Sequence, residues 1–282
     1  MTDGIGLGMA GGDDASRPSS GGRDSRSDAH AGRGTAGCDH DAGSHDGTVP
    51  SAASAPEASR AWFLIEHPGP WPHPLAGLAL PAPLGKAADA AARLGIRVQM
   101  IRRPGRPGRR RAAAGAFSVF AGWTAGSRPW LERSVFRHGD LTRPGQLADL
   151  DLEGLSLGRR PGFGVPVSGP LVLVCTHGRR NPCCARLGGP LARALAGRHG
   201  DQVWETTHVG GDLYAANLVI LPHGLYYGPV DSRAAGAAIE AYRRGEVILD
   251  RYRGRAGRSA SAQAAEHSAR RLTGLRGIGD LE

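Results

Sequence analysis

Three cysteines lie close together in the sequence, Cys175, Cys183 and Cys184, and a histidine, His208, follows them. Thiolate and imidazole are donors for zinc and for iron–sulfur clusters, and a thiolate can also attack a disulfide. A Gly-Gly turn follows His208 and lets the backbone pass close to whatever the imidazole contacts. Asp212 comes next, as a carboxylate ligand or as the group that orients the histidine. These residue types predict a site for a metal or for thiol chemistry, in which Cys175, one cysteine of the doublet and His208 converge.

The spacing of these residues does not by itself identify the chemistry. Cys-x7-Cys-Cys with a distant histidine matches neither a zinc finger, nor a thioredoxin CxxC motif, nor a plant-type ferredoxin. A histidine at the end of a strand is more often simply part-buried, and adjacent cysteines are often a core residue beside a surface residue. His177 and His223 are interpreted as loop residues, and Cys38 as an inert residue of the N-terminal segment.

Two local signals position the cysteines. The apolar run 171–175 predicts a buried strand that ends at Cys175. Asn181 and Pro182 predict a helix start, with asparagine as the N-cap and proline at the first helical position. The doublet then lies in the first helical turn, where unpaired N–H groups and the helix dipole favour a thiolate. The strand end and the helix start can therefore deliver two thiols to one centre.

The other elements predict an α/β fold with helices packed on a small mixed sheet. The second half should follow the order β-α-β-β-β-α. Strands are expected at 61–67, 96–101, 116–124 with 130–136, 171–175, 202–208, 217–222 and 224–230. Helices are expected at 86–94, 146–155, 181–198 with a possible break at 188–190, and 232–247, with a marginal helix at 259–272.

Composition divides the chain into four parts. Residues 1–60 are rich in Gly, Ser, Ala, Asp and Arg, so they cannot bury enough apolar surface and are predicted to be disordered. Residues 61–165 are expected to form an N-terminal α/β lobe, residues 166–250 the domain that carries the cysteines, and residues 251–282 an Arg-rich, mostly flexible tail.

The net charge is +9, but Lys86 is the only lysine and the arginines are scattered, without any nucleic-acid motif. Nucleic-acid binding is therefore not expected. No apolar run approaches the ~20 residues that span a bilayer, and the N-terminus does not look like a secretory signal. The sequence predicts a cytoplasmic protein, and clustered cysteines in that compartment more often bind metal or do redox chemistry than form structural disulfides.

Three stretches resemble the sucrase/ferredoxin-like family: CTHGRRNPCCA (175–185), VWETTHVGGDLYAANLVILPHGLYYG (203–228) and LIEHPGPW (64–71). The resemblance covers about 61–250 and implies a thioredoxin-like fold for 166–250. Fungal members of the family hold a [2Fe-2S] cluster through two cysteines and the two histidines of an H-x3-H motif. The resemblance therefore implies the same cofactor here.

Carried over to this sequence, Cys175 matches the first cysteine and one of Cys183 and Cys184 the second. His208 matches the first histidine, but Asp212 replaces the second. The fourth ligand is then Asp212, the other cysteine of the doublet, a nearby histidine, or nothing. Cys175, Cys183, Cys184 and His208 form the preferred metal-binding set, because the doublet supplies a third thiolate within one turn.

The resulting hypothesis is a one-electron [2Fe-2S] carrier that exchanges electrons with an unidentified redox partner protein, and scattered surface arginines would suit an acidic partner. A histidine ligand would raise the reduction potential and make it pH-dependent. The alternative is a thiol–disulfide oxidoreductase on the same scaffold, with Cys183 as nucleophile and Cys175 or Cys184 as the resolving thiol. Sucrase activity is not expected, because no pair of carboxylates has the pattern of a glycosidase.

Overall fold

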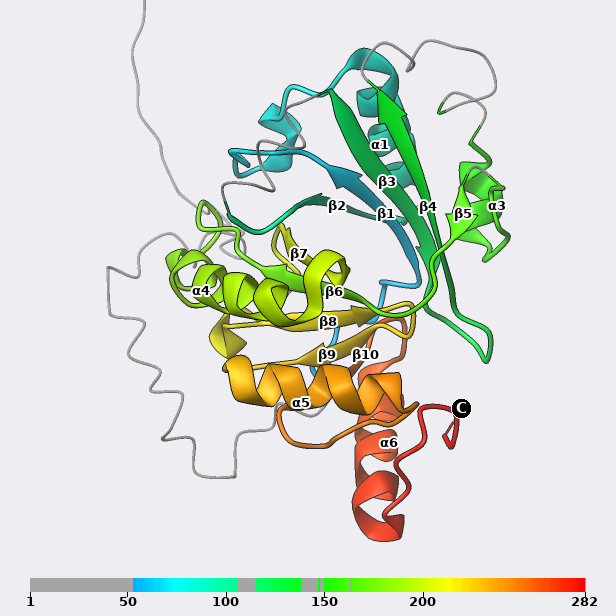
Figure 1. Ribbon diagram of the computed structural model, residues 1–282. Coiled ribbons are helices and arrows are strands. Elements are labelled where there is room, and N and C mark those ends of the chain that lie inside the picture. Colours follow the sequence, from blue (N-terminus) through cyan, green and yellow to red (C-terminus); the bar gives the residue numbers. More distant parts are fainter. Residues whose placement is uncertain (1–52, 106–114, 138–146, 148–149, 163, 282) are drawn as a thin grey trace, which may run out of the picture. The chain divides into compact units, whose positions relative to one another are not determined.

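The computed structural model describes residues 53–105, 115–137, 147, 150–162 and 164–281. All of them belong to the compact unit His40–Glu282. Of the segment that was predicted to be disordered, 1–60, residues 1–52 lie outside the described residues. Residues 53–60 differ from the prediction, because Ala55 and Ser59 are buried and Ala55 exchanges two hydrogen bonds with Gln263. The mixed α/β class is confirmed. In the described part of the chain, ten strands form one curled mixed sheet, and helices pack on it (Figure 1).

The predicted elements occur in the predicted order, and β5 and β10 are additional strands. The strands are β1 (Ala61–Glu66), β2 (Arg97–Arg102), β3 (Ala116–Trp123), β4 (Trp130–Arg137), β5 (Val165–Pro166), β6 (Leu171–Cys175), β7 (Val203–Thr206), β8 (Leu218–Leu221), β9 (Leu225–Tyr227) and β10 (Tyr252–Arg255). The helices are α1 (Ala82–Arg93), α3 (Leu152–Ser156), α4 (Pro182–His199), α5 (Ser232–Arg243) and α6 (Ala260–Thr273), with short 3-10 turns η1 (Leu75–Gly77), η4 (Gly200–Gln202) and η5 (Asp212–Tyr214).

The two halves of the sheet repeat one connectivity. Strands run in the order β2-β1-β3-β4 in the first half and β7-β6-β8-β9 in the second. In each half the first strand pairs in parallel with the strand after the first helix and antiparallel with the third strand, which pairs antiparallel with the fourth. The predicted boundary at residue 165 stays a prediction, because both halves share one sheet.

The carboxyl ends of the two halves meet where β2 and β7 pair. These strands are antiparallel and are joined through their last residues, with Ile101 opposite Thr206 and Arg102 opposite Glu205. Glu205 is buried and accepts hydrogen bonds from Arg102 Nε at 2.6 Å and from Thr176 Oγ1 at 3.1 Å. An ion pair with a further hydrogen bond therefore spans the junction.

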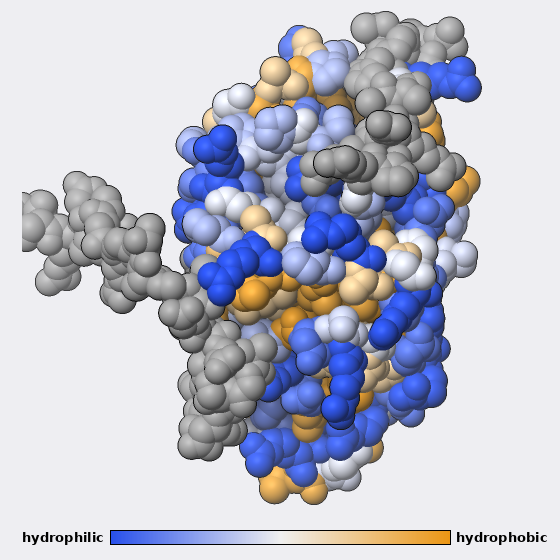
Figure 2. Space-filling model, turned by 60° about the vertical axis from the view of Figure 1, so that its left-hand side comes forward, coloured by the Kyte–Doolittle hydropathy of each residue, from blue (hydrophilic) through white to orange (hydrophobic). Residues whose placement is uncertain are grey.

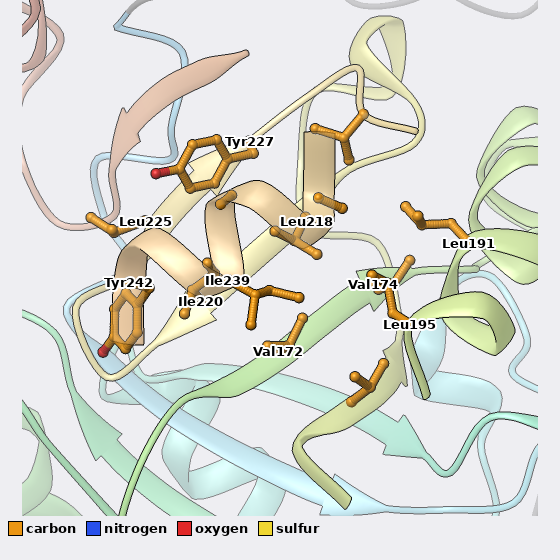
Figure 3. Close-up of a cluster of buried hydrophobic side chains, with 14 of the residues drawn as sticks. Val172, Val174, Leu191, Leu195, Leu218, Ile220, Leu225, Tyr227, Ile239 and Tyr242 are labelled. Carbon is orange, nitrogen blue, oxygen red and sulfur yellow. The ribbon is translucent and has the colours of Figure 1, made fainter. Parts of the chain in front are cut away.

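Side chains alternate across the sheet and build three apolar clusters. On β6, Val172 and Val174 face α4 and α5, where they pack with Leu195 and Ile239 (Figure 3). Leu173 and Cys175, on the opposite face, belong to the central cluster. This cluster joins the two halves and also contains Trp62, Leu64, Phe120, Leu171 and Trp204. Cys175 therefore points toward the region between the halves.

Helix α4 begins as predicted. The side chain of Asn181 accepts the N–H of Cys183 at 2.8 Å, and Pro182 occupies the first turn. The helix then continues without a break through residues 188–190 to His199. Gly188 permits its close approach to β6, because a Cβ atom there would lie 2.0 Å from the carbonyl oxygen of Cys175.

The C-terminal segment 251–282 differs from the prediction of a mostly flexible tail, since it contains β10 and α6. Buried Glu266 accepts hydrogen bonds from Arg255, Arg258 and Arg270. The helix predicted at 259–272 is confirmed as α6, whereas β10 was not predicted. Polar contacts hold this segment, so its low apolar content did not indicate how firmly it packs. Element bounds differ as well: within the described part of 146–155 the helix is α3, α1 begins earlier than predicted, at Ala82, and α5 ends earlier, at Arg243.

No helix in the described ranges is long and apolar enough to cross a membrane. The cytoplasmic location stays a prediction.

Candidate metal centre

Three of the predicted donors lie together at the carboxyl edge of the second half. The sulfur atoms of Cys175 and Cys184 and a ring nitrogen of His208 all lie within 4.8 Å of one another. His208 Nδ1 is 4.0 Å from Cys175 Sγ and 3.9 Å from Cys184 Sγ. Both cysteines are fully buried and His208 is half-buried. Two thiols and an imidazole form a donor set that suits zinc or the iron of an iron–sulfur cluster.

Local structure explains why these residues converge. Strands β6 and β7 are parallel, and Cys175 pairs with Thr206, so His208 leaves the sheet two residues beyond the level of Cys175. Helix α4 then brings the buried side of its first turn, at Cys184, onto the same edge. The contact of Gly188 with the carbonyl of Cys175 sets the distance between helix and strand.

The thiol of Cys175 is prepared to lose its proton. A hydrogen bond from the Cys184 thiol is the main cause that holds the pKa of Cys175 well below its usual range. The His208 ring and the backbone N–H groups of His177 and Val209 act in the same direction, and together they overcome the effect of burial, which raises the pKa. A thiolate is the form that binds metal.

The backbone of His208 is held on both sides. Its N–H donates to Nδ1 of His177 at 3.4 Å. Its carbonyl accepts from Gln99 Nε2 at 3.2 Å and from an Arg97 guanidinium nitrogen at 3.3 Å. Gln99 Oε1 also accepts from the hydroxyl of Thr207. Strand β2, which belongs to the first half, therefore positions the histidine of the second half.

His177 supports the site instead of joining the donor group. Since its Nδ1 accepts a hydrogen bond, its Nε2 carries the proton and donates to the carbonyl of Pro72 at 3.0 Å. Burial lowers the pKa of His177, which favours this neutral form. The rings of Trp71 and His73 pack edge-on against it, at 6.2 and 6.0 Å between centroids. The LIEHPGPW stretch and the residues after it thus reach the site through His177.

The turn after His208 is held by a buried arginine. Gly210 and Gly211 have φ angles of +95° and +71°, and a Cβ atom at Gly211 would lie 2.1 Å from the guanidinium of Arg253. Arg253 donates to the carbonyl of Gly210 at 3.3 Å and to Oδ1 of Asn217. The glycine pair therefore does let the chain turn tightly, but the close neighbour is Arg253.

The remaining predicted residues are placed differently. Cys183 lies in the first turn of α4, is half-buried and disulfide-bonded, and is not a member of the donor group found among the described residues. Asp212 is the first residue of η5, and the structure describes its backbone only.

Gln99, Arg97 and Arg253 were not foreseen as site residues. In the sequence, each of them is a polar residue within a predicted or observed strand. Many strands at a protein surface contain such residues, so this pattern does not indicate a site. Their contacts with His208 and its turn join positions far apart in the chain.

Comparison with known proteins agrees with this geometry. The family model described as Sucrase/ferredoxin-like matches residues 116–254. "Altered inheritance of mitochondria protein 32" of Meyerozyma guilliermondii is 33% identical over 104 residues, which cover 31% of this chain and 35% of that protein. The match thus spans about a third of that relative's length. No solved structure gives a significant match.

Proposed function

Because residues 116–254 belong to the sucrase/ferredoxin-like family, we propose that this protein is a one-electron carrier with a [2Fe-2S] cluster. Cys175, Cys184 and His208 are the proposed ligands. The observation that carries the proposal is the convergence of these three donors within 4.8 Å at the family's own motif. Asp212 is the proposed fourth ligand, since it stands at the second position of the H-x3-H pattern.

The topology supports a thioredoxin-like fold for the second half. Strand order β7-β6-β8-β9, with a parallel β6–β7 pair and an antiparallel β8–β9 hairpin, is that of a thioredoxin-like sheet. Helix α4 follows the first of these strands in the chain and α5 follows the last, as that fold requires. The first half has the same strand order, so we propose that it is a second thioredoxin-like unit without the cysteines.

The donor set fits an iron–sulfur cluster. Thiolate and imidazole are the ligands of mixed Cys/His [2Fe-2S] centres. The buried position of Cys175 and Cys184 would shield the centre from solvent. Two of the open alternatives for the fourth ligand lose support: both ring nitrogens of His177 make hydrogen bonds, and Cys183 is not in the donor group.

When bound, the cluster supplies reversible one-electron chemistry. The chain's own residues would set its potential. Hydrogen bonds from the N–H groups of His177 and Val209 to Cys175 stabilise added negative charge on the sulfur, which raises the potential. With Nδ1 of His208 turned toward the thiols, Nε2 would carry the proton that couples electron transfer to pH.

The thiol–disulfide alternative receives less support. In that alternative Cys183 was the nucleophile, but Cys183 is disulfide-bonded in the structure. Cys175 has a lowered pKa and Cys184 lies beside it, which is the arrangement of an exchanging dithiol. Both thiols are fully buried, however, so a protein disulfide could not reach them without local opening.

The test is anaerobic purification of the full chain, with iron and sulfide assays, absorption spectra and EPR of the reduced protein. The proposal expects about two iron and two sulfide atoms per chain. A protein that stays without iron after anaerobic reconstitution would overturn it.

Single variants then identify the ligands. Cys175→Ser, Cys184→Ser and His208→Ala should lose the cluster. Cys183→Ser removes a disulfide-bonded cysteine outside the donor group and should keep the cluster. Asp212→Ala should lower the iron content, and Asp212→His, which restores H-x3-H, should retain the cluster with a shifted potential and EPR spectrum. Loss of iron in Cys183→Ser with full retention in Asp212→Ala would instead make Cys183 the fourth ligand.

A further inference from the structure

The segment that begins directly after Cys175 is strongly basic. From Thr176 to Gly200 the chain has five arginines and neither aspartate nor glutamate. Arg179, Arg180, Arg186, Arg193 and Arg198 are all exposed, and none of them has an ion-pair partner among the described residues. Some exposed arginines elsewhere, such as Arg159 and Arg244, do have acidic partners, whereas others, such as Arg271 and Arg276, have none among the described residues. The segment beside the donors is therefore distinguished by five arginines in a run of chain without a single carboxylate side chain.

Helix geometry aligns part of this charge. Arg186 and Arg193 are seven positions apart, which is two turns, so they project from the same exposed side of α4. Cys184, Gly188 and Leu191 occupy the opposite, buried side. Arg180 lies at the start of the row, where its guanidinium contacts Nε2 of His73 at 3.0 Å. The row of charge thus begins beside the thiols and runs along the helix.

An apolar hollow adjoins this row. Its volume is about 290 Å³, and its lining includes Leu187, Pro190 and Ala194 of α4 and, across from them, Ala215 and Pro229. Leu213, on the loop that follows His208, is 70% exposed. On the side that Figure 2 brings forward, apolar surface lies between hydrophilic areas.

One acidic residue, Asp231, also borders the hollow. Its carboxylate caps α5 by accepting the N–H of Ala234 at 2.7 Å. It forms no ion pair with the arginines of the row among the described residues. One carboxylate against these arginines leaves the surface positively charged.

We propose that this surface, formed by Arg179, Arg180, Arg186, Arg193 and the adjacent hollow, docks an acidic redox protein that exchanges electrons with the centre. The inference rests on the proposed function, since it names the partner of that site. An apolar centre with a charged rim is the usual composition of a protein–protein interface. Complementary charge would steer a partner onto the exposed side of α4, the helix whose first turn carries Cys184.

Nucleic acid is the other polyanion that a basic row could bind. Proteins that bind single strands alternate basic residues with aromatic side chains, on which the bases stack. The segment 176–200 contains no Phe, Tyr or Trp. The hollow beside it also favours an apolar anchor from a protein.

The experiment uses two haem proteins of opposite charge as probes, acidic cytochrome b5 and basic cytochrome c. Binding is measured by isothermal titration, and electron exchange with the haem iron by stopped flow, at 20 mM and 300 mM salt. The test variant is Arg186→Glu/Arg193→Glu. The matched control is Arg271→Glu/Arg276→Glu, which changes net charge equally at exposed positions on and after α6, away from α4 in Figure 1.

At low salt, the test variant should lose about tenfold or more in affinity and in exchange rate for cytochrome b5, because steering contributes factors of this order. The control should change either quantity less than about threefold, and high salt should remove the difference. Exchange with cytochrome c should rise or stay level. The inference would be overturned if both double variants lost affinity for cytochrome b5 equally. It would also be overturned if this face bound a 20-nucleotide DNA strand and did not bind cytochrome b5.

Binding does not require the cluster, so the two proposals fail separately. A chain without iron that still binds cytochrome b5 through these arginines would keep the docking surface and reject the carrier. A chain that holds the cluster, and whose electron-exchange rate is the same in both charge-reversed variants as in the unchanged protein, would keep the carrier and reject the docking surface.

Discussion

Replacing Gly188 by alanine should move the donor groups apart, although Gly188 is not itself a donor. A Cβ atom there would lie 2.0 Å from the carbonyl oxygen of Cys175 and 3.1 Å from its carbonyl carbon. Carbon–oxygen contacts settle at about 3.3–3.6 Å, so α4 and β6 must separate by at least about 1 Å. The obstacle is backbone, which cannot rotate away. Since Cys184 lies on α4 and Cys175 on β6, this separation increases the distance between the two thiols.

The expected cost follows from two opposing effects. Overpacking of this kind costs about 1–3 kcal/mol, whereas alanine in place of glycine within a helix gains up to about 1 kcal/mol. Gly188→Ala should therefore lower the free energy of unfolding by about 1–2 kcal/mol. Gly189→Ala is the matched control, because its Cβ would meet only Arg193 at 3.6 Å, and it should gain up to about 1 kcal/mol.

Urea unfolding of the metal-free chain measures the stability, and cobalt(II) titration followed through the thiolate absorption bands measures the site. Metal sites tolerate about 0.2 Å in ligand distance, so a shift of 1 Å should weaken cobalt binding in Gly188→Ala by at least tenfold. Gly189→Ala should bind as the unchanged protein does. If Gly188→Ala gained stability and bound cobalt normally, the helix–strand contact would not be what sets the distance between the thiols.

Two further predictions concern residues that support the site and the fold. Gln99→Leu removes a donor to the carbonyl of His208 and the acceptor of two threonine hydroxyls. It should lower the free energy of unfolding in urea by about 1–3 kcal/mol and shift the reduction potential of the centre. An unchanged potential would mean that β2 does not position His208. Burial lowers the pKa of His223 from 6.5 to about 4, and its Nδ1 pairs with the Tyr242 hydroxyl at 2.6 Å. Because the unfolded chain takes up a proton at higher pH than the folded one, the free energy of unfolding should fall by up to about 3 kcal/mol as pH drops from 6.5 to 4. His223→Asn should flatten that slope, and an equally steep slope in this variant would assign it to other groups.

Much of the site could be predicted from the sequence, because its signals are local. The apolar run before Cys175 specifies a buried strand, and Asn181-Pro182 specifies the helix start through a cap that involves adjacent residues. The spacing of His208 and its glycine pair is likewise a short-range pattern. These signals predicted that two thiols and an imidazole lie at the ends of three elements, and the family resemblance implied a [2Fe-2S] cluster.

The choice between Cys183 and Cys184 was not in the sequence. Neighbouring helical residues point about 100° apart, so the side of α4 that packs on the sheet decides which thiol enters the donor group. That side is settled where Gly188 meets the carbonyl of Cys175, a contact between a helix and a strand. Local propensity is the same for both cysteines and cannot distinguish them.

Long-range polar contacts were also decided only by the tertiary structure. Gln99 reaches the carbonyl of His208 across 109 positions, and Arg253 reaches Ser54 across 199. Glu266 orders the C-terminal segment through three arginines that composition alone would place in solvent. The sequence by itself determined which residues could bind a metal and on which elements they lie. Which of them meet depends on the pairing of β2 with β7 and the packing of α4. Those contacts join segments far apart in the chain, and no local sequence pattern in either segment specifies its partner.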